Sequence, residues 1–349
     1  MVKVTILGAG VTGMTIASCL PKDSEITIVG AHLPGDAPSK EWASPWAAAI
    51  WVGVHESSPR EQAMQLRAFA GLWALAETDP ASSVRRTTVT EIMDMGCKAD
   101  VWYQYKVPDF RFLGPGELPQ GALYGMRYSS VVITPTVFLP WMAARLQAQG
   151  VRFQRLKVTS LAQLQGMGHD ILINASGYGS KTLLDVQDSA MLPVRLQSAI
   201  IKHPTYQGLH IHRGRDYYST QFSRLDGTVY IGGIIEYGSD DVSVTEDGRD
   251  LIFRRAHQEQ PEVFTSPDAQ DYDLVSDHTG FYPMRARDKG GVRVEKELLG
   301  SQKVIHAYGQ HAGGYVFSFG IAHEVANLVA EFMDQIPATS TPVRPARLS

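Results

Sequence analysis

The stretch Val2-Lys3-Val4-Thr5-Ile6-Leu7-Gly8-Ala9-Gly10-Val11-Thr12-Gly13 decides the fold. A short apolar run ends at Gly8, and an amphipathic helix follows the third glycine. In a dinucleotide-binding turn, Gly8 permits the tight turn, Gly10 lets the backbone approach a pyrophosphate, and Gly13 lets helix and strand pack closely. The free N–H groups of the helix start, at Val11 and Thr12, then face the anion. We therefore predict a dinucleotide site, with a glycine-rich turn that binds no ligand as the alternative.

The second strand expected in this unit, residues 25–29, lacks the acidic residue that usually follows it and binds the adenosine ribose. His32 occupies the expected place, and Asp36 lies beyond it. Because an imidazole can hydrogen-bond a hydroxyl, we expect His32 to contact the ribose. The alternative is a loop histidine in solvent.

The composition bounds the class of protein. The 349 residues suffice for one large or two ordinary domains, with 44% hydrophobic and 19% charged residues. A net charge of −4 without a long basic run argues against a nucleic acid or an anionic membrane as partner. The two cysteines, Cys19 and Cys97, form neither a disulfide framework nor a metal-binding pattern, which suits a reducing compartment. We expect neither a membrane span nor a signal peptide.

The spacing of hydrophobic residues predicts the helices and strands along the chain. Ser58-Pro59-Arg60-Glu61 is typical of a capping box, and a helix with an apolar stripe follows it. The middle of the chain alternates at period two, which predicts an antiparallel sheet and hence a second domain inserted into the first. Strands are expected at 84–95, 103–107, 121–132, 151–158, 170–175, 209–212, 217–221, 228–235 and 304–308. Helices are expected at 134–150, 251–258 and 318–332, with a solvated linker at 238–250 and a flexible tail at 336–349.

Four segments together resemble one family. Val304-Ile305-His306-Ala307-Tyr308-Gly309-Gln310-His311-Ala312-Gly313-Gly314, with Gly320 and Ala322 after it, resembles the signature of the D-amino-acid oxidase family, particularly of its fungal members. It departs at His311, where that family carries a small residue. Asn174-Ala175-Ser176-Gly177, Pro193-Val194-Arg195-Leu196-Gln197 and Ala43-Ser44-Pro45-Trp46-Ala47 resemble further segments of the family. The resemblance runs from residue 2 to about residue 332.

The resemblance implies FAD as the cofactor and two interleaved domains. The fold class is then α/β, with a Rossmann-type FAD-binding domain formed by residues 1–50, 137–190 and 283–335. An antiparallel-sheet substrate domain is formed by residues 51–136 and 191–282. By motif position, the FAD-binding residues are Gly8, Gly10 and Gly13 at the pyrophosphate, Ser44 and Ala48 at the flavin, Val158 at the adenine, Ser176 and Gly177 in a second glycine turn, and Gly314, Tyr315 and Val316 at the pyrimidine edge of the isoalloxazine.

The resemblance also implies a mechanism without a side-chain base. The substrate enters with a neutral amine, and its α-hydrogen leaves as a hydride to the flavin. The imine hydrolyses to a keto acid and ammonia, and oxygen reoxidises the flavin to give hydrogen peroxide.

The substrate residues depart from the family's pattern. In the family, an arginine in a Gly-x-Arg-Pro stretch binds the substrate carboxylate, aided by a tyrosine. Here Gly280-Phe281-Tyr282-Pro283-Met284-Arg285 aligns Tyr282 with that arginine from the left, and Arg285 with it from the right. We prefer Arg285, with a surface charge as the alternative.

The family's tyrosine position falls near Phe222, and Tyr218 lies one short strand-length earlier. We expect Tyr218 to act as a lid or carboxylate contact, unless it is a packing residue of the sheet. A second tyrosine position corresponds to Ile235. His311, or the carbonyls around Ala312 and Gly313, is expected to help hold the amine.

Three functions compete on this basis. The first is an FAD-dependent oxidase of neutral, bulky D-amino acids, which uses oxygen. The second is a related oxidase of amines or modified amino acids without a free carboxylate. The third is a flavin-holding protein without turnover or a nicotinamide-dependent dehydrogenase. We expect no metal, a possible homodimer, and a cytosolic location. Ala346-Arg347-Leu348 resembles a peroxisomal tripeptide, the alternative location, but sits one residue short of the terminus.

Overall fold

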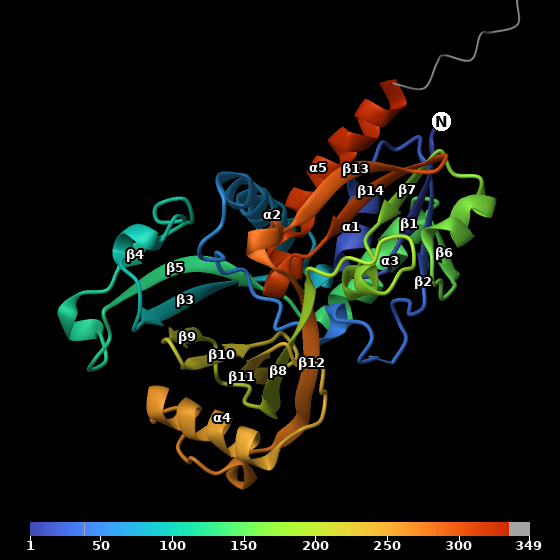
Figure 1. Ribbon diagram of the computed structural model, residues 1–349. Helices are drawn as coiled ribbons and strands as arrows, with labels where there is room; N and C mark the ends of the chain where they lie inside the picture. Colours follow the sequence, from blue (N-terminus) through green and yellow to red (C-terminus); the bar gives the residue numbers. More distant parts are fainter. Residues whose placement is uncertain (38, 335–349) are drawn as a thin grey trace, which may run out of the picture.

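Two sheets organise the computed structural model, which describes residues 1–37 and 39–334 (Figure 1). The predicted tail at 336–349 lies outside these residues. The first sheet has six strands in the order β13-β14-β7-β1-β2-β6, and its neighbours are parallel except for the antiparallel pair β13 and β14. Its strands are β1 (Lys3–Leu7), β2 (Glu25–Gly30), β6 (Arg152–Arg155), β7 (Ile171–Asn174), β13 (Arg293–Leu299) and β14 (Gln302–Tyr308).

The second sheet has eight strands in the order β12-β8-β11-β10-β9-β3-β5-β4. All neighbours are antiparallel except β3 and β9, which are parallel. Its strands are β3 (Arg85–Met93), β4 (Arg111–Phe112), β5 (Tyr124–Val132), β8 (Met191–Lys202), β9 (Leu209–Arg213), β10 (Tyr218–Ser223), β11 (Thr228–Tyr237) and β12 (Leu274–Arg285). The predicted α/β class, with a Rossmann-type sheet and a separate antiparallel sheet, is confirmed.

Five α-helices cover these sheets: α1 (Val11–Cys19), α2 (Pro59–Thr78), α3 (Pro135–Ala148), α4 (Glu246–Glu259) and α5 (Gly314–Asp334). Helix α1 packs against both α3 and α5, and α2 packs against α5. Helix α4 lies across the eight-stranded sheet at the end of the molecule farthest from α5 (Figure 1). Its Ile252 and Phe253 share a small core there with Ile201 and Val229.

Helix α5 is long and apolar enough, by length and composition alone, to cross a membrane. Half of its most apolar window is buried inside the protein, including Phe317, Ile321 and Val325. A core helix of a globular domain has the same properties, and the packing of α5 on α1 and α2 accounts for its apolar character.

Capping chemistry explains where α2 begins. The Ser58 side chain accepts the Glu61 N–H, and the Glu61 side chain accepts the Ser58 N–H, as the capping-box pattern predicted. Proline at the first helical position, Pro59, adds a preset backbone angle.

Two predicted elements are wrong. Residues 103–107 form turns rather than a strand, because Tyr103 fills the core and binds the buried Glu91. The apolar residues at 103–107 resemble a strand in sequence, but this segment pairs with no strand in the described structure. The predicted linker at 238–250 ends in the first turn of α4, where Glu246 and Asp247 favour a helix N-terminus.

Candidate active site

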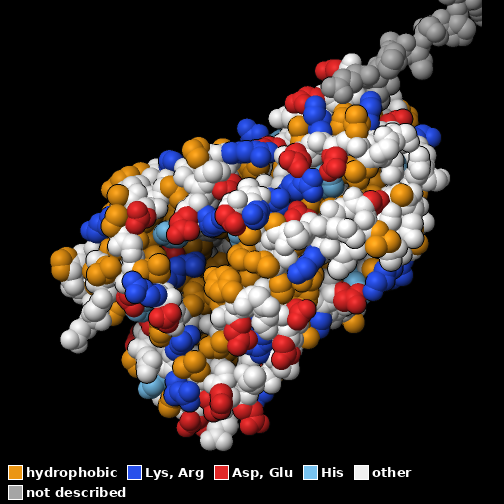
Figure 2. All heavy atoms as spheres, viewed as in Figure 1, with side chains coloured by type: hydrophobic (Ala, Val, Ile, Leu, Met, Phe, Trp, Pro, Cys, Tyr) orange, Lys and Arg blue, Asp and Glu red, His pale blue; other side chains and the backbone are white. Residues whose placement is uncertain are grey.

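One large cavity of about 1460 Å³ connects the two sheets. Its wall includes the glycine turn after β1 and, on the other side, strand ends of the eight-stranded sheet. In the space-filling view, hydrophobic side chains gather around a hollow at the centre of the molecule (Figure 2). A drug-sized ligand occupies about 300–1,000 Å³. This cavity therefore has room for a dinucleotide together with a small second molecule.

Steric constraints explain the three glycines of the first turn. Gly8 has φ +120°, and a Cβ there would lie 2.3 Å from the Ala175 carbonyl oxygen. A Cβ at Gly10 would lie 2.7 Å from Ser44 Oγ, and one at Gly13 would lie 1.9 Å from the Gly8 carbonyl oxygen. Gly8 and Gly10 line the cavity. Gly13 does not line it and supports the turn from behind, which corrects its assignment as a pyrophosphate contact.

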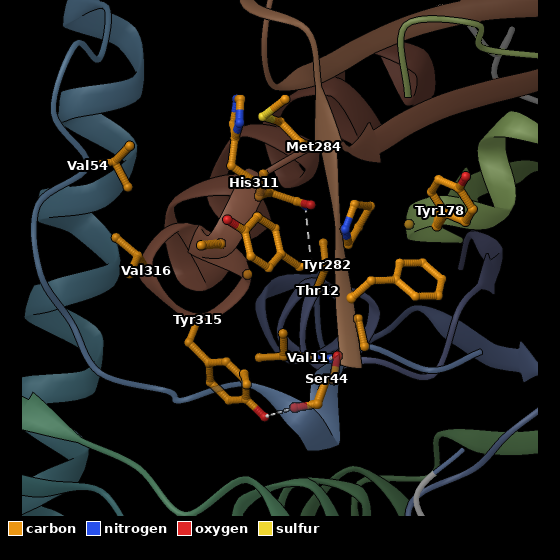
Figure 3. A pocket seen from close by; sticks show the side chains of 18 of the residues that line it. Val11, Thr12, Ser44, Val54, Tyr178, Tyr282, Met284, His311, Tyr315 and Val316 are labelled. Carbon is orange, nitrogen blue, oxygen red and sulfur yellow. Dashed lines mark hydrogen bonds between the residues drawn. The ribbon is translucent and has the colours of Figure 1, made fainter. Parts of the chain in front are cut away.

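The start of α1 faces the cavity with free donors (Figure 3). The Val11 N–H donates to Ser44 Oγ at 3.1 Å, and Gln310 Nε2 donates to Thr12 Oγ1 at 3.3 Å. The first turn carries no acidic residue and Gly10 offers no side-chain cap. The other unpaired N–H groups of this turn can therefore bind an anion, and the helix dipole favours its charge.

His32 and Val158, the residues expected at the ribose and the adenine, both line the cavity. His32 Nε2 is buried and has no hydrogen-bond partner among the described residues. Asp36 binds Arg155 through both carboxylate oxygens, at 2.6 and 2.7 Å, and these bonds lower the pKa of its carboxyl group. Because Asp36 is already paired, and Glu41 lies 3.6 Å from His32 Nε2 without a hydrogen bond, His32 stays the predicted ribose contact.

The flavin end is formed by two segments that are distant in sequence. Ser44 and Ala48 come from the loop before α2, and Gly314, Tyr315 and Val316 begin α5; all five line the cavity. Tyr315 donates its hydroxyl to the Ser44 carbonyl at 3.2 Å, which ties the two segments together (Figure 3). The second glycine turn, Ser176 and Gly177, also reaches the wall.

His311 lines the cavity, but its neighbour Gly313 does not. Gly313 is buried, and a Cβ there would lie 2.6 Å from the ring of Phe317, so this glycine packs closely against α5, and the contact of its carbonyl with the amine stays a prediction. His311 has φ +55°, and its Nε2 is buried without a hydrogen-bond partner among the described residues. Burial lowers the pKa of His311 to about 4, so the side chain is a neutral imidazole near pH 7.

The opposite wall carries tyrosines. Tyr218, Tyr237 and Tyr282 line the cavity, together with Ile235 and Met284. Tyr282 extends from β12 toward the side where His311 and Val316 lie (Figure 3). Burial raises the pKa of the Tyr218 and Tyr282 hydroxyls, so both stay protonated hydrogen-bond donors.

Two predicted substrate residues lie elsewhere. Arg285 is not part of the wall: its Nε donates to Asp188 at 2.8 Å, and its Nη1 donates to the Gly291 carbonyl at 3.2 Å. The Asp188 side chain is only 7% exposed, so this ion pair is largely removed from water. Phe222 is fully buried and stacks on Tyr230 with ring centroids 4.8 Å apart. The preference for Arg285 was wrong, and Tyr282 stands at the cavity instead.

Three cations line the cavity within the described part of the chain: Lys157, Arg213 and Arg287. Sequence reasoning missed the two arginines. A signal for Arg213 did exist, because Glu91 falls on the same face of its predicted strand as Val89 and Met93. A carboxylate at a core position requires a buried partner, and Arg213 supplies it at 2.9 Å.

The glycine turn at a helix start, joined through one cavity to a tyrosine-lined wall on a second sheet, is typical of a dinucleotide-dependent oxidoreductase. The chain belongs to the FAD dependent oxidoreductase family (DAO), which matches residues 3–328.

Known relatives agree with this family. The chain is 28% identical to a D-amino-acid oxidase of Fusarium vanettenii, over 93% of this chain and 96% of that protein. It is equally 28% identical to a D-aspartate oxidase of Talaromyces thermophilus, over 94% and 95% of the two chains. The glycine oxidase structure from Geobacillus kaustophilus superposes with a TM-score of 0.72 at 18% identity and covers 95% of each chain, which shows a shared fold.

The residues present fit FAD. The unpaired nitrogens of His32, Trp42 and His311 are buried, yet all three residues line the cavity. Buried polar atoms in native proteins nearly always have a partner, so these positions indicate a polar ligand. The start of α1 suits the pyrophosphate, and the start of α5 suits the isoalloxazine edge that becomes anionic on reduction. When bound, FAD supplies hydride acceptance at this place.

Proposed function

We propose that this protein is an FAD-dependent oxidase of D-amino acids. The observation that carries the proposal is the single cavity, which joins the predicted flavin site at Ser44 and Tyr315 to donors at Tyr218, Tyr282 and Arg213. A D-amino acid with a neutral amine would lose its α-hydrogen as a hydride and give the imine, which water converts to a 2-oxo acid and ammonia. Oxygen would take the electrons and form hydrogen peroxide.

The protein's own residues would position the substrate rather than remove its proton. His311 is held neutral and can accept a hydrogen bond from an amine, as can the Ala312 carbonyl on the same segment. The tyrosine hydroxyls on the other wall can donate to a carboxylate. Holding the α-carbon between these groups would supply the orientation that hydride transfer requires.

A second candidate keeps the flavin chemistry and changes the substrate. Tyr282, which one of the two possible alignments sets against the family's carboxylate-binding arginine, lines the cavity, and Arg285 is paired with Asp188. Both observations favour an amine, or a modified amino acid, that lacks a free carboxylate.

Anaerobic reduction of the bound flavin separates the two candidates. The purified holoenzyme is mixed with D-alanine, D-phenylalanine, their L-enantiomers, and ethylamine and phenethylamine as decarboxylated counterparts. We expect bleaching of the flavin by the D-amino acids, with peroxide formed on admission of air. Bleaching by the amines alone would establish the second candidate, and bleaching by no compound would refute both. The homodimer and the cytosolic location stay predictions, which size-exclusion chromatography and a tagged copy would test.

A further inference from the structure

Arg213 is the last residue of β9 and reaches the cavity from the eight-stranded sheet. Its Nε donates to Oε1 of Glu91 at 2.9 Å, and its guanidinium lies 5.3 Å from the ring centre of Tyr218. The backbone around it is fixed as well, because the Asp94 N–H donates to its carbonyl at 2.8 Å. The direction of the side chain is thus determined before any ligand enters.

Glu91 is fully buried and accepts two further hydrogen bonds, from the hydroxyls of Tyr103 at 2.8 Å and Tyr128 at 3.1 Å. Both tyrosines are fully buried. Their donated protons stabilise the carboxylate charge, so Glu91 does not depend on Arg213 alone. A guanidinium has donors on all three nitrogens, and Glu91 takes only the one on Nε.

The outer end of Arg213 is free. Within the described residues its terminal nitrogens Nη1 and Nη2 have no hydrogen-bond partner, and 32% of its side chain is exposed on the cavity wall. Tyr218, whose ring faces the guanidinium, and Tyr282 line the same cavity as Arg213. The guanidinium of Arg213 therefore reaches the tyrosine-lined wall of the cavity.

The other cations of the wall are occupied. Arg287 donates through Nη1 to the Glu56 carbonyl at 2.5 Å and through Nη2 to the His55 carbonyl at 3.0 Å. Lys157 pairs with Glu41 at 3.1 Å, next to the expected adenine position at Val158. Arg213 is the described cation that combines access to the tyrosine wall with unpaired donors.

We propose that Arg213, oriented by Glu91, binds a carboxylate of the substrate and replaces the family's arginine in this role. This inference rests on the proposed function and names the group that selects the substrate. The α-carboxylate of any amino acid and the side-chain carboxylate of an acidic one present the same chemistry, a planar anion that a guanidinium fork binds through two hydrogen bonds. The pocket is then specific for carboxylates even though Tyr282 and Arg285 are not a clamp.

A binding experiment tests the anchor without turnover. The oxidised holoenzyme is titrated with benzoate, a carboxylate without an amine, and with benzamide, its uncharged counterpart, and the flavin absorbance reports binding. Arg213→Met should weaken benzoate at least about 30-fold, the loss typical of an unpaired charge in a partly dry site, and leave benzamide unchanged. Arg213→Lys should recover part of the affinity, because it restores the charge without the fork.

A matched control tests whether the loss is specific to Arg213, and a second variant covers the case in which Arg213→Met does not fold. Arg215→Met makes the same change two residues away on an exposed side chain that does not line the cavity, and should bind benzoate like the wild type. If Arg213→Met fails to fold because Glu91 is left unpaired, the double variant Glu91→Gln/Arg213→Met removes both charges and should show the same loss. Benzoate affinity that is unchanged in either variant would overturn the inference.

Turnover then identifies which carboxylate is bound and separates this inference from the proposed function. A higher KM of Arg213→Met for both D-alanine and D-aspartate would assign the α-carboxylate, and a rise for D-aspartate alone would assign the side chain. D-amino-acid oxidation that is insensitive to Arg213→Met would overturn the anchor and leave the function standing. Benzoate binding that needs Arg213 in a protein that oxidises no amino acid would overturn the function alone.

Discussion

Gly13→Ala should weaken FAD binding by distorting the turn, although Gly13 does not line the cavity. A Cβ at this position would lie 1.9 Å from the Gly8 carbonyl oxygen, 3.1 Å from the Gly8 carbonyl carbon and 3.3 Å from Ile6 Cγ2. Real Cβ atoms essentially never approach closer than 3.0 Å, so helix and turn must separate by about 1.1 Å. The two nearest of these atoms belong to the backbone of Gly8, which cannot rotate away as a side chain would.

Two opposing effects decide the magnitude. Alanine is better than glycine inside a helix by about 0.5–1 kcal/mol, whereas overpacking of this kind costs about 1–3 kcal/mol or more. The steric clash is the larger effect, and we expect a net loss of about 1–2 kcal/mol in the free energy of unfolding, or about 1–3 °C in Tm for a chain of this size. Displaced N–H groups also lose charge-assisted hydrogen bonds to the pyrophosphate, worth about 1.5–3 kcal/mol each. FAD should therefore bind at least about tenfold more weakly.

The assay is a titration of the apoprotein with FAD, followed by flavin fluorescence, beside thermal unfolding of the same samples. Gly166→Ala is the matched control, because a Cβ there meets nothing within 4 Å and Gly166 lies outside the cavity. A Gly13→Ala protein with the FAD affinity and Tm of this control would refute the steric account of the third glycine.

Two further variants test other parts of the structure. Burial, with the charge of Arg224 as a second cause, lowers the pKa of His278 from 6.5 to about 4, so stability is complete above about pH 6.5 and falls as the pH drops toward 4. In the wild type, His278 Nε2 lies 2.7 Å from the Trp46 carbonyl oxygen, and the amide of His278→Gln can donate to the same carbonyl. This variant should avoid up to about 3 kcal/mol of the stability loss that the wild type shows in acid. A Tm that falls with pH as steeply as the wild type's would contradict this expectation. Arg285→Met removes the nearer cation from Asp188, which keeps Arg293 at 4.0 Å and the Tyr308 hydroxyl at 2.9 Å, and should cost about 2 kcal/mol of unfolding free energy, while its KM for D-alanine stays that of the wild type. A raised KM at unchanged stability would return Arg285 to the substrate site.

The local chemistry of the FAD half could be predicted because it depends on short segments. The glycine spacing, the helix start behind it and the signature at α5 can each be recognised within a short segment, although the structure adds distant steric partners, Ala175 for Gly8 and Ser44 for Gly10. The structure places Gly8, Ser44 and Tyr315 on one cavity, as the motif order implied. The register of parallel strands brings such segments together at one edge of the sheet.

The substrate half could not be predicted to the same depth, because its side chains depend on partners far away in sequence. Arg285 points to Asp188, a residue in an irregular loop that nothing in the local pattern singles out. Arg213 is oriented by Glu91, which lies 122 positions earlier. Alignment placed an arginine near the expected position, but only the fold determines which arginine reaches the cavity.

The packing of α1 against α5 has a consequence for how the protein is made. Thr15 near the N-terminus donates to the Ser318 carbonyl at 3.3 Å, and Gln310 binds Thr12 across the same gap. During synthesis the glycine turn leaves the ribosome first, and its partners at 310–318 follow only after nearly the whole chain. The start of α1 and residues 310–318 therefore come into contact late in synthesis. A chain released before residue 310 would expose the face of α1 that α5 covers. Binding of the flavin therefore requires that synthesis has passed the start of α5.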